Sequence, residues 1–352
     1  MEYENESAEP ESPMDERIGK GWTLLESGDV DGARELAGLV LEEGEPDADA
    51  LLLKAACERE DGDDEAALEV LAEAIKQDPE WATPRLWTAE LLLLQGRGVE
   101  ALKHARAAVE LADDEDEFLA AVIFRSTLEL ESDNPAAAKA GLEELPPADV
   151  LAGTPEMALE AAELHLALGQ TEKARALAQA VVDANEDEEA VTDAWYTLGL
   201  VEESAGDEKA KRRAWLKVHD ADAKAAEGSE GFVADEDEVA AMAESAVEEL
   251  PVKARKLLKN VPILIADFPS REEVTEGLDP RLLGLFRGTP LPETETLGAA
   301  PALTQIVLYR HNLQRVAPDD ASLAEEVRTT LLHETGHFFG LDEEELAAMG
   351  LD

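Results

Sequence analysis

A turn signature recurs along the first two-thirds of the chain at intervals of 34 to 37 residues. Its copies are Gly28-Asp29, Gly62-Asp63, Gly96-Arg97, Ser132-Asp133, Gly169-Gln170 and Gly206-Asp207. An alanine follows five residues after the start of the first five copies, at Ala33, Ala67, Ala101, Ala137 and Ala174. Twelve residues before these alanines stand Gly21, Ala55, Ala89, Arg125 and Ala162, small side chains in all copies but the fourth. A repeat of this length predicts helical hairpins that bury their apolar faces only by stacking on their neighbours.

Two further motifs indicate which family of helical repeat this is. The sixth copy reads Trp195-Tyr196-Thr197-Leu198-Gly199, and Asp78-Pro79 closes the second copy. With the spaced alanines, this pattern resembles the tetratricopeptide repeat (TPR), which opens with W-x-x-L-G and closes with proline. The resemblance implies a solenoid of about six units over residues 17–224, with a groove for a protein or peptide partner. A helical-hairpin array of another type is the alternative.

Near the C-terminus the chain reads His333-Glu334-Thr335-Gly336-His337, an H-E-x-x-H motif. Residues four apart lie on one face of a helix, so the two histidines can bind one Zn²⁺ together. Glu334 stands beside them, where it can take a proton from the attacking water. We therefore predict that His333 and His337 are metal ligands and that Glu334 is the catalytic base.

The residues around the motif favour a helix with a defined start and end. Ser322 and Glu325 have the spacing of a capping box, so we expect the helix to begin there. Gly340 falls where a helix end would need a positive φ. There are two alternatives to a working metal centre. The motif could be a chance match in which both histidines are core residues, or the fold could be genuine but its metal site idle.

The H-E-x-x-H motif gives two metal ligands but does not identify the third. Glu343 lies three residues past the glycine that ends the motif helix, and a carboxylate is an acceptable ligand of Zn²⁺. Asp342 and Glu344 are its neighbours and rivals, and the whole acidic run could instead be solvated surface. His311, which follows the strand-like residues 306–309, is a further candidate ligand. Tyr309 could polarise a substrate carbonyl, or it could be a core residue.

Roughly the last 120 residues, from about 232, resemble the short bacterial zincin-like metallopeptidases, also called minimal zincins. The resemblance rests on segments in a fixed order: Glu248-Glu249-Leu250-Pro251, residues 262–270, residues 282–291, residues 306–310 and residues 326–341 with the H-E-x-x-H motif. It implies a compact α+β zincin fold with a short tail and a peptidase site. Members commonly carry aspartate as the third ligand, so Glu343 is a longer variant.

These patterns divide the chain into parts of different composition. Residues 1–16 hold seven acidic side chains and no lysine or arginine, so we expect a disordered tail. The TPR-like array follows over 17–224, a linker over 225–235, and the zincin-like domain over 236–352. Residues 293–300 read as a loop. The predicted fold class is therefore multidomain, an all-α TPR-like solenoid followed by a small α+β domain.

The formal net charge of -52 restricts the partners of the chain. It argues against nucleic acid and anionic membrane surfaces and favours basic proteins or peptides, although it could serve solubility alone. Cys57 is the single cysteine, so no disulfide can form within the chain. Without an apolar run of spanning length or a secretory pattern, we expect a cytoplasmic protein that does not enter a membrane.

Two functions of different classes fit the sequence. The first is a zinc-dependent metallopeptidase, with Glu334 as general base and a TPR module that engages a protein partner. The second is a TPR interaction scaffold that carries a degenerate or idle zincin-fold domain. The intact set of His333, Glu334 and His337 favours the first, because a degenerate site has no need of the glutamate.

Overall fold

The computed structural model describes residues 13–43, 47–185, 187–228, 234–288, 290, 304–317 and 319–347. The chain forms two compact units, Met1–Leu177 and Ala178–Asp352. Within the described ranges the first unit is entirely helical, whereas the second combines helices with a three-stranded sheet. Together they give the expected class, a helical repeat array followed by a small α+β region. The predicted loop 293–300 and most of the predicted linker lie outside the described residues.

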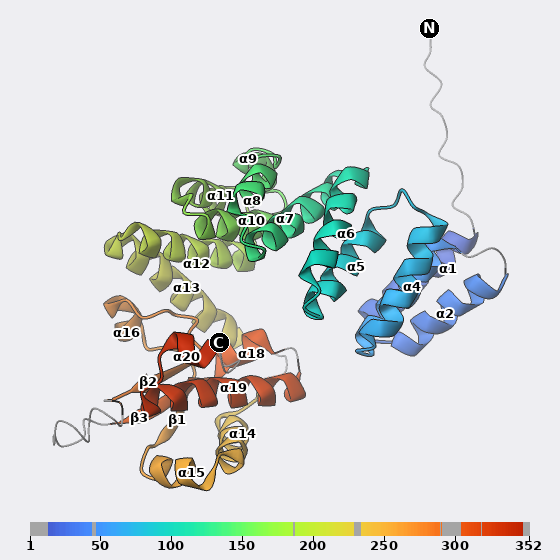
Figure 1. Cartoon of the computed structure of the whole chain (residues 1–352). Helices are drawn as coiled ribbons and strands as arrows, with labels where there is room; N and C mark the ends of the chain where they lie inside the picture. Colours follow the sequence, from blue (N-terminus) through green and yellow to red (C-terminus); the bar gives the residue numbers. More distant parts are fainter. Residues whose placement is uncertain are drawn as a thin grey trace. The chain divides into compact units, whose positions relative to one another are not determined.

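The N-terminal unit consists of consecutive helical hairpins (Figure 1). Its helices are α1 (Pro13–Glu26), α2 (Val30–Glu43), α3 (Ala48–Glu60), α4 (Asp64–Gln77), α5 (Thr83–Leu94), α6 (Gly98–Leu111), α7 (Glu115–Glu131), α8 (Pro135–Leu142), α9 (Ala148–Leu151), α10 (Pro155–Ala167) and the start of α11 (Thr171–Ala184). Each hairpin packs on the next through α2 and α3, α4 and α5, and α6 and α7. The apolar face of each hairpin is therefore buried by its neighbour, as the repeat predicts.

The recurring turns adopt the conformation that their residues favour. Gly28, Gly62, Gly96 and Gly169 all have a left-handed backbone, with φ between 68° and 82°. In the fourth copy, which lacks the glycine, Asp133 takes φ 55° instead. Aspartate tolerates this region better than most residues, so the tight turn survives the loss of glycine.

The spaced alanines mark the helix contacts. In four copies the predicted alanine is fully buried, at Ala33, Ala67, Ala101 and Ala174. In the fourth copy Ala138, rather than the predicted Ala137, is the fully buried residue. The contact position is therefore shifted by one residue there.

The fourth hairpin is the irregular one. Its second helix, α8, has only eight residues and is followed by the single turn of α9. Arg125, which stands where the other copies have a small residue, pairs with Glu144 at 2.8 Å. The break in the sequence pattern thus coincides with a break in the helical pattern.

The helix α1 begins at Pro13, inside the segment that the sequence predicts as a disordered tail. The remainder of that predicted tail, residues 1–12, lies outside the described residues. The helix thus begins four residues earlier than the expected array start at residue 17.

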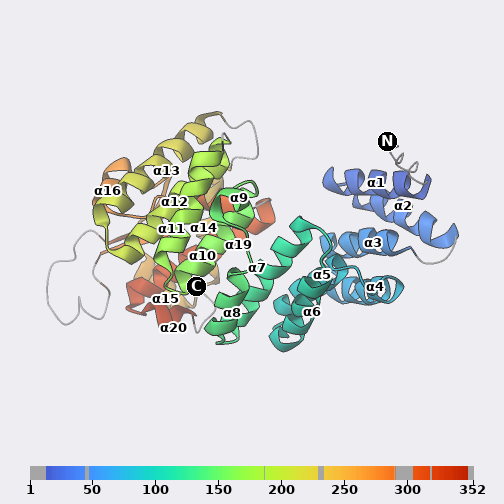
Figure 2. The ribbon, with the colours of Figure 1, turned by 90° about the horizontal axis from the view of Figure 1, so that it is seen from above.

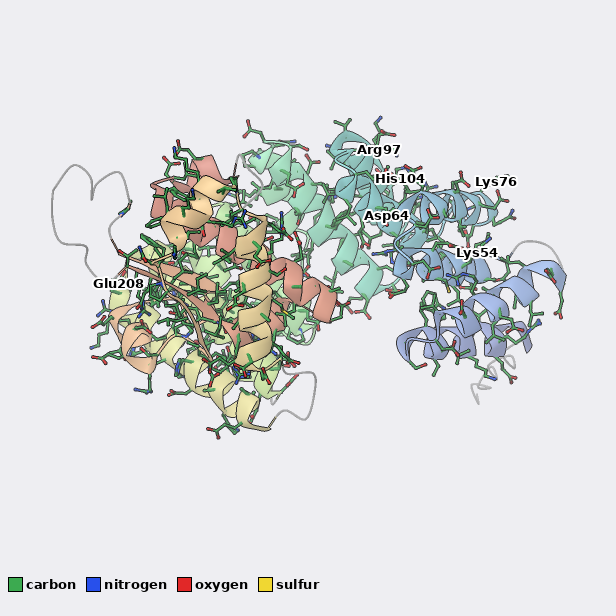
Figure 3. The ribbon with its side chains drawn as sticks, turned by 90° about the horizontal axis from the view of Figure 1, so that it is seen from below. Lys54, Asp64, Lys76, Arg97, His104 and Glu208 are labelled. Atoms are coloured by element: carbon green, nitrogen blue, oxygen red, sulfur yellow. The ribbon has the colours of Figure 1, made fainter. Side chains whose placement is uncertain are left out.

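Two exposed basic side chains of the N-terminal unit pair with acidic residues three positions away in the sequence. Lys76 contacts Glu73 at 3.0 Å, and Arg97 contacts Glu100 at 2.9 Å; Figure 3 shows where Lys76 and Arg97 lie. Both pairs are exposed and local in the sequence, so water screens them and they do not tie one hairpin to the next.

The C-terminal unit begins within α11 and contains the last hairpin of the repeat, α12 (Glu188–Ala205) and α13 (Glu208–Gly228). Trp215 of α13 is fully buried, and a Cβ placed on Gly199 of α12 would lie 1.9 Å from its indole Nε1. The glycine of the W-x-x-L-G motif is therefore required, because the tryptophan ring occupies the space of a side chain. Figure 2 shows α12 and α13 lying side by side.

The rest of this unit is a small α+β assembly. Its elements are α14 (Glu236–Glu249), α15 (Val252–Leu258), β1 (Ile263–Ala266), α16 (Arg271–Glu276), β2 (Gly284–Arg287), β3 (Gln305–Tyr309), α18 (Arg310–Val316), α19 (Asp320–Phe339) and α20 (Glu343–Ala347). The central strand β3 runs parallel to β1 and antiparallel to β2. Ile306 and Leu308 of β3 are buried in one core with side chains of α14 and α19.

The last hairpin is tied to the α+β assembly by buried polar contacts. Asp222 of α13 pairs with Arg281 at 3.1 Å and also with Arg315 of α18. Arg281 reaches Asp193 of α12 at 2.7 Å as well. The Tyr196 hydroxyl donates to Asp279 at 2.9 Å. Although the repeat pattern assigns α12 and α13 to the array, their packing makes them part of the C-terminal unit.

This network leads to a first expectation. Asp222→Asn should leave Arg281 and Arg315 short of a buried carboxylate, which typically costs about 1–3 kcal/mol. We expect amide hydrogen exchange to become about tenfold faster or more in α13 and in the segment around Arg281, measured by mass spectrometry. The control is Glu188→Gln, which removes an exposed pair with Lys224. Equal exchange rates in the two variants would show that the Asp222 network does not hold the hairpin in place.

Candidate metal centre

The motif helix is α19, and its start differs from the expected one. Asp319, rather than Ser322, caps the helix: its Oδ1 accepts a hydrogen bond from the Ser322 amide at 2.8 Å. The predicted capping box of Ser322 and Glu325 was therefore wrong, because an aspartate three residues earlier already occupies the cap and its charge suits a helix N-terminus. The expected end is confirmed, since Gly340 has φ 85°.

The two histidines of α19 converge on one point. Their Nε2 atoms are 2.9 Å apart, and both side chains are about three-quarters buried. The Nδ1 atom of His337 lies 3.2 Å from the Leu341 carbonyl oxygen, which can only accept a hydrogen bond. This contact puts the proton of the neutral ring on Nδ1 and leaves a lone pair on Nε2, the arrangement that a metal ligand requires.

Glu343 is brought to the same point by the turn after α19. Its carboxylate oxygens lie 3.6 Å from the Nε2 of His333 and 3.3 Å from the Nε2 of His337. The close packing of α20 on α19 explains the position: a Cβ on Gly336 would lie 2.3 Å from Leu346, a fully buried residue. The glycine inside the H-E-x-x-H motif therefore admits the helix that carries Glu343.

The neighbouring acids behave differently. Asp342 caps α20, since its Oδ1 accepts from the Glu345 amide at 2.9 Å and its own amide donates to Glu345 at 3.1 Å. Both side chains are thus engaged in a capping box. The Glu344 side chain lies outside what the structure describes. Of the two acids beside Glu343, Asp342 is accounted for by the helix cap.

The donor set matches the demands of a zinc ion. With Zn–N and Zn–O bonds of about 2.05 Å and tetrahedral angles, two ligand atoms should be about 3.3 Å apart. The three separations here are 2.9, 3.3 and 3.6 Å, which bracket that value. Two imidazoles and one carboxylate also form a known type of catalytic zinc site, which keeps a further position for water or substrate. The residues present therefore fit the ion that the motif implies.

Glu334 is held at the edge of this cluster by the sheet. It is 6% exposed, and one of its carboxylate oxygens accepts a hydrogen bond from the Phe286 amide of β2 at 2.5 Å. Burial raises the pKa of this carboxyl above its ordinary value, and the Phe286 amide and the two histidines oppose that rise. The strand comes this close because residue 284 is a glycine: a Cβ there would lie 3.0 Å from the Glu334 side chain.

The two other candidates from the sequence lie elsewhere. His311 stacks on Phe268, with ring centroids 4.8 Å apart, and is absent from the cluster of metal-binding atoms among the described residues. Tyr309 is 1% exposed, and its hydroxyl accepts a hydrogen bond from Arg287 at 3.2 Å. Tyr309 is therefore a core residue of β3.

A second acidic group, Asp113, Asp114 and Glu117, also has convergent oxygens within the described ranges. Hydrogen bonds explain it without a metal. Asp114 caps α7 by accepting from the Glu117 amide at 2.8 Å. Glu117 in turn accepts from the indole of Trp81 at 3.1 Å. The group joins two neighbouring repeats and contains no histidine.

Comparisons with known families agree with this division of the chain. Residues 258–351 match the family described as zincin-like metallopeptidase. Residues 18–82, 65–116 and 159–226 match the family described as tetratricopeptide repeat. The stretch between the repeat matches, 117–158, contains most of α7 and all of α8 and α9, the irregular fourth hairpin. No curated protein matches the chain.

The comparison with solved structures finds repeat proteins of low sequence identity. A thermophilic TPR protein of Thermus thermophilus is 21% identical, with 53% of this chain and 98% of that one covered and a TM-score of 0.43. The pilF protein of Pseudomonas aeruginosa is 20% identical, with 61% and 93% covered and a TM-score of 0.47. Among the described helices, none is both long and apolar enough to cross a membrane.

Proposed function

We propose that this chain, which carries tetratricopeptide repeats within residues 18–226 and a zincin-like metallopeptidase domain over 258–351, is a zinc-dependent peptidase. The observation that carries the proposal is the convergence of three metal-binding side chains beside a buried glutamate. His333, His337 and Glu343 would hold the ion, and Glu334 would act on the water.

The chemistry divides between the ion and Glu334. Bound zinc would lower the pKa of the attacking water and polarise the scissile carbonyl. Glu334 would take a proton from that water as its oxygen attacks the carbonyl carbon, and would then give the proton to the leaving nitrogen as the C–N bond breaks. The raised pKa of Glu334 suits both steps, because the group must accept and release the same proton.

The repeats supply the second half of the proposal. Arrays of this kind present an extended surface to a protein or peptide partner, so we assign them the recruitment of the substrate or of a regulator. With a net charge of -52 on the chain, a basic partner is favoured by long-range attraction, and nucleic acid and anionic membranes are disfavoured. An unstructured basic protein is therefore the first substrate to test.

The test compares two glutamates of the same acidic run. The wild-type chain should bind about one zinc ion and cleave a basic, unstructured protein, and chelation should abolish cleavage. Glu343→Gln should weaken zinc affinity by about 100-fold, because it removes an anionic ligand. Glu345→Gln is the control: it removes an equal charge, and glutamine can keep the capping box with Asp342. The measurements are a zinc titration with a competing chelator and mass spectrometry of the products.

Two results would contradict parts of this proposal. Equal zinc affinities in the two glutamine variants would remove Glu343 from the ligand set. A zinc-loaded wild-type chain that cleaves no protein, basic or acidic, would favour the interaction scaffold with an idle zincin fold.

A further inference from the structure

A cavity of about 190 Å³ opens beside the metal centre. On one side it is lined by α19, with Glu326, Thr329, Thr330, His333 and Glu334, and on the other by residues 282–284. Small-molecule sites commonly have about 300–1,000 Å³, whereas one water occupies about 30 Å³ in the liquid. The size therefore suits a single side chain of a peptide that lies at the metal centre.

His333, a proposed metal ligand, lies at one end of the cavity, and the carboxylate of Glu326 lies at the other. Glu326, Thr330 and His333 are spaced i, i+4 and i+7, so they share one face of α19. Glu326 lies two turns before His333, about 10 Å along the helix axis. An occupant that enters beside the ion must therefore be long to reach this carboxylate.

Glu326 has no cation of its own in the described part of the chain. It is partly buried, and neither a hydrogen bond nor an ion pair is found for it there. The nearest cation along the helix, Arg328, is engaged by Glu325 and Glu249, each at 3.0 Å. A partly buried carboxylate in a cavity gains more from a cation than an exposed one, because water screens the pair less.

The wall opposite α19 is fixed in place. Asn312, which is 1% exposed, donates to the carbonyls of Pro280 and Leu282 at 2.9 and 2.8 Å. The Tyr309 amide donates to the Leu283 carbonyl at 2.8 Å. The leucine pair is therefore preorganised, and an incoming side chain meets a formed apolar surface rather than a mobile loop.

We propose that this cavity is a specificity pocket for a lysine or arginine side chain of the substrate, and that Glu326 binds its charge. The long aliphatic stem would pack on Leu282 and Leu283 while the cationic end reaches the carboxylate. This inference rests on the proposed function, since the peptide must lie across the metal centre. It goes further by naming the residue that selects the substrate.

The first experiment measures specificity. The zinc-loaded full chain is incubated with a proteome-derived peptide library, and cleavage sites are read by mass spectrometry. We expect lysine and arginine to be enriched about tenfold at one position beside the cleaved bond. Glu326→Gln should abolish the enrichment. Glu325→Gln, an equal charge change at an exposed position of the same helix, should keep it. An unchanged preference in Glu326→Gln, or a wild-type preference for uncharged side chains, would overturn the proposal.

The second experiment does not depend on turnover. The hydroxamates of lysine and norleucine share a zinc-chelating group and carry a charged and a neutral side chain of similar length. By calorimetry, the lysine compound should bind the wild-type chain about tenfold more tightly, and Glu326→Gln should erase the difference. Equal affinities of the wild type for the two hydroxamates would overturn the proposed specificity pocket but not the peptidase. Tighter binding of the lysine compound without cleavage of any peptide would overturn the proposed peptidase activity but not the pocket. Neither binding nor cleavage would overturn both.

Discussion

Glu334→Gln should reduce peptide cleavage by about 100-fold or more while zinc remains bound. Glutamine has nearly the same volume as glutamate, and its amide oxygen can still accept the hydrogen bond from the Phe286 amide. The fold around β2 and α19 should therefore persist. What is lost is the ability to take a proton from water, a function worth roughly two to four orders of magnitude in rate. Cleavage rate and zinc content are the two measurements.

The matched control for this variant is Glu325→Gln. It makes the same change of charge and volume at an exposed position of the same helix, where the side chain pairs with Arg328. Both its zinc content and its rate should stay at the wild-type level. A Glu334→Gln protein that cleaves as fast as the wild type would show that another group is the base, or that a contaminating peptidase causes the activity.

The repeat array was predictable because its spacing follows from contacts inside each hairpin. The turn glycines need a positive φ, and the alanines stand where two helices touch, so residue type and position are linked. The grouping of α12 and α13 with the C-terminal unit was not predictable. It depends on Asp222, Arg281 and Tyr196, which are polar residues far apart in the sequence and look like ordinary surface positions.

The candidate metal centre was likewise predictable only in part. The i,i+4 spacing places His333 and His337 on one face of any helix, so this pair of ligands could be predicted from the sequence. The orientation of Glu334 could not, because it depends on a backbone amide, that of Phe286, and a backbone N–H gives no signal in a sequence. Asp319 was missed as the helix cap because Ser322 and Glu325 offered a competing pattern with the right spacing.

His337→Ala should remove stoichiometric zinc from the protein. His337 supplies one of three convergent donors, and its ring is oriented by the Leu341 carbonyl, so no other described side chain is placed to substitute for it. With one nitrogen donor gone, we expect zinc affinity to fall by more than about 100-fold. Elemental analysis after dialysis against a weak chelator measures the loss directly.

His311→Ala is the control for the loss of a histidine as such. His311 belongs to the same unit but stacks on Phe268 away from the metal-binding atoms, so this variant should retain about one zinc ion per chain. Zinc binding also stabilises the folded state, by about 4 kcal/mol when the free ion is at about 1,000 times its dissociation constant. Chelation should therefore lower the melting temperature of the wild type and of His311→Ala, but leave His337→Ala unchanged. Equal zinc content in the two alanine variants would mean that the histidine pair of α19 does not hold the ion.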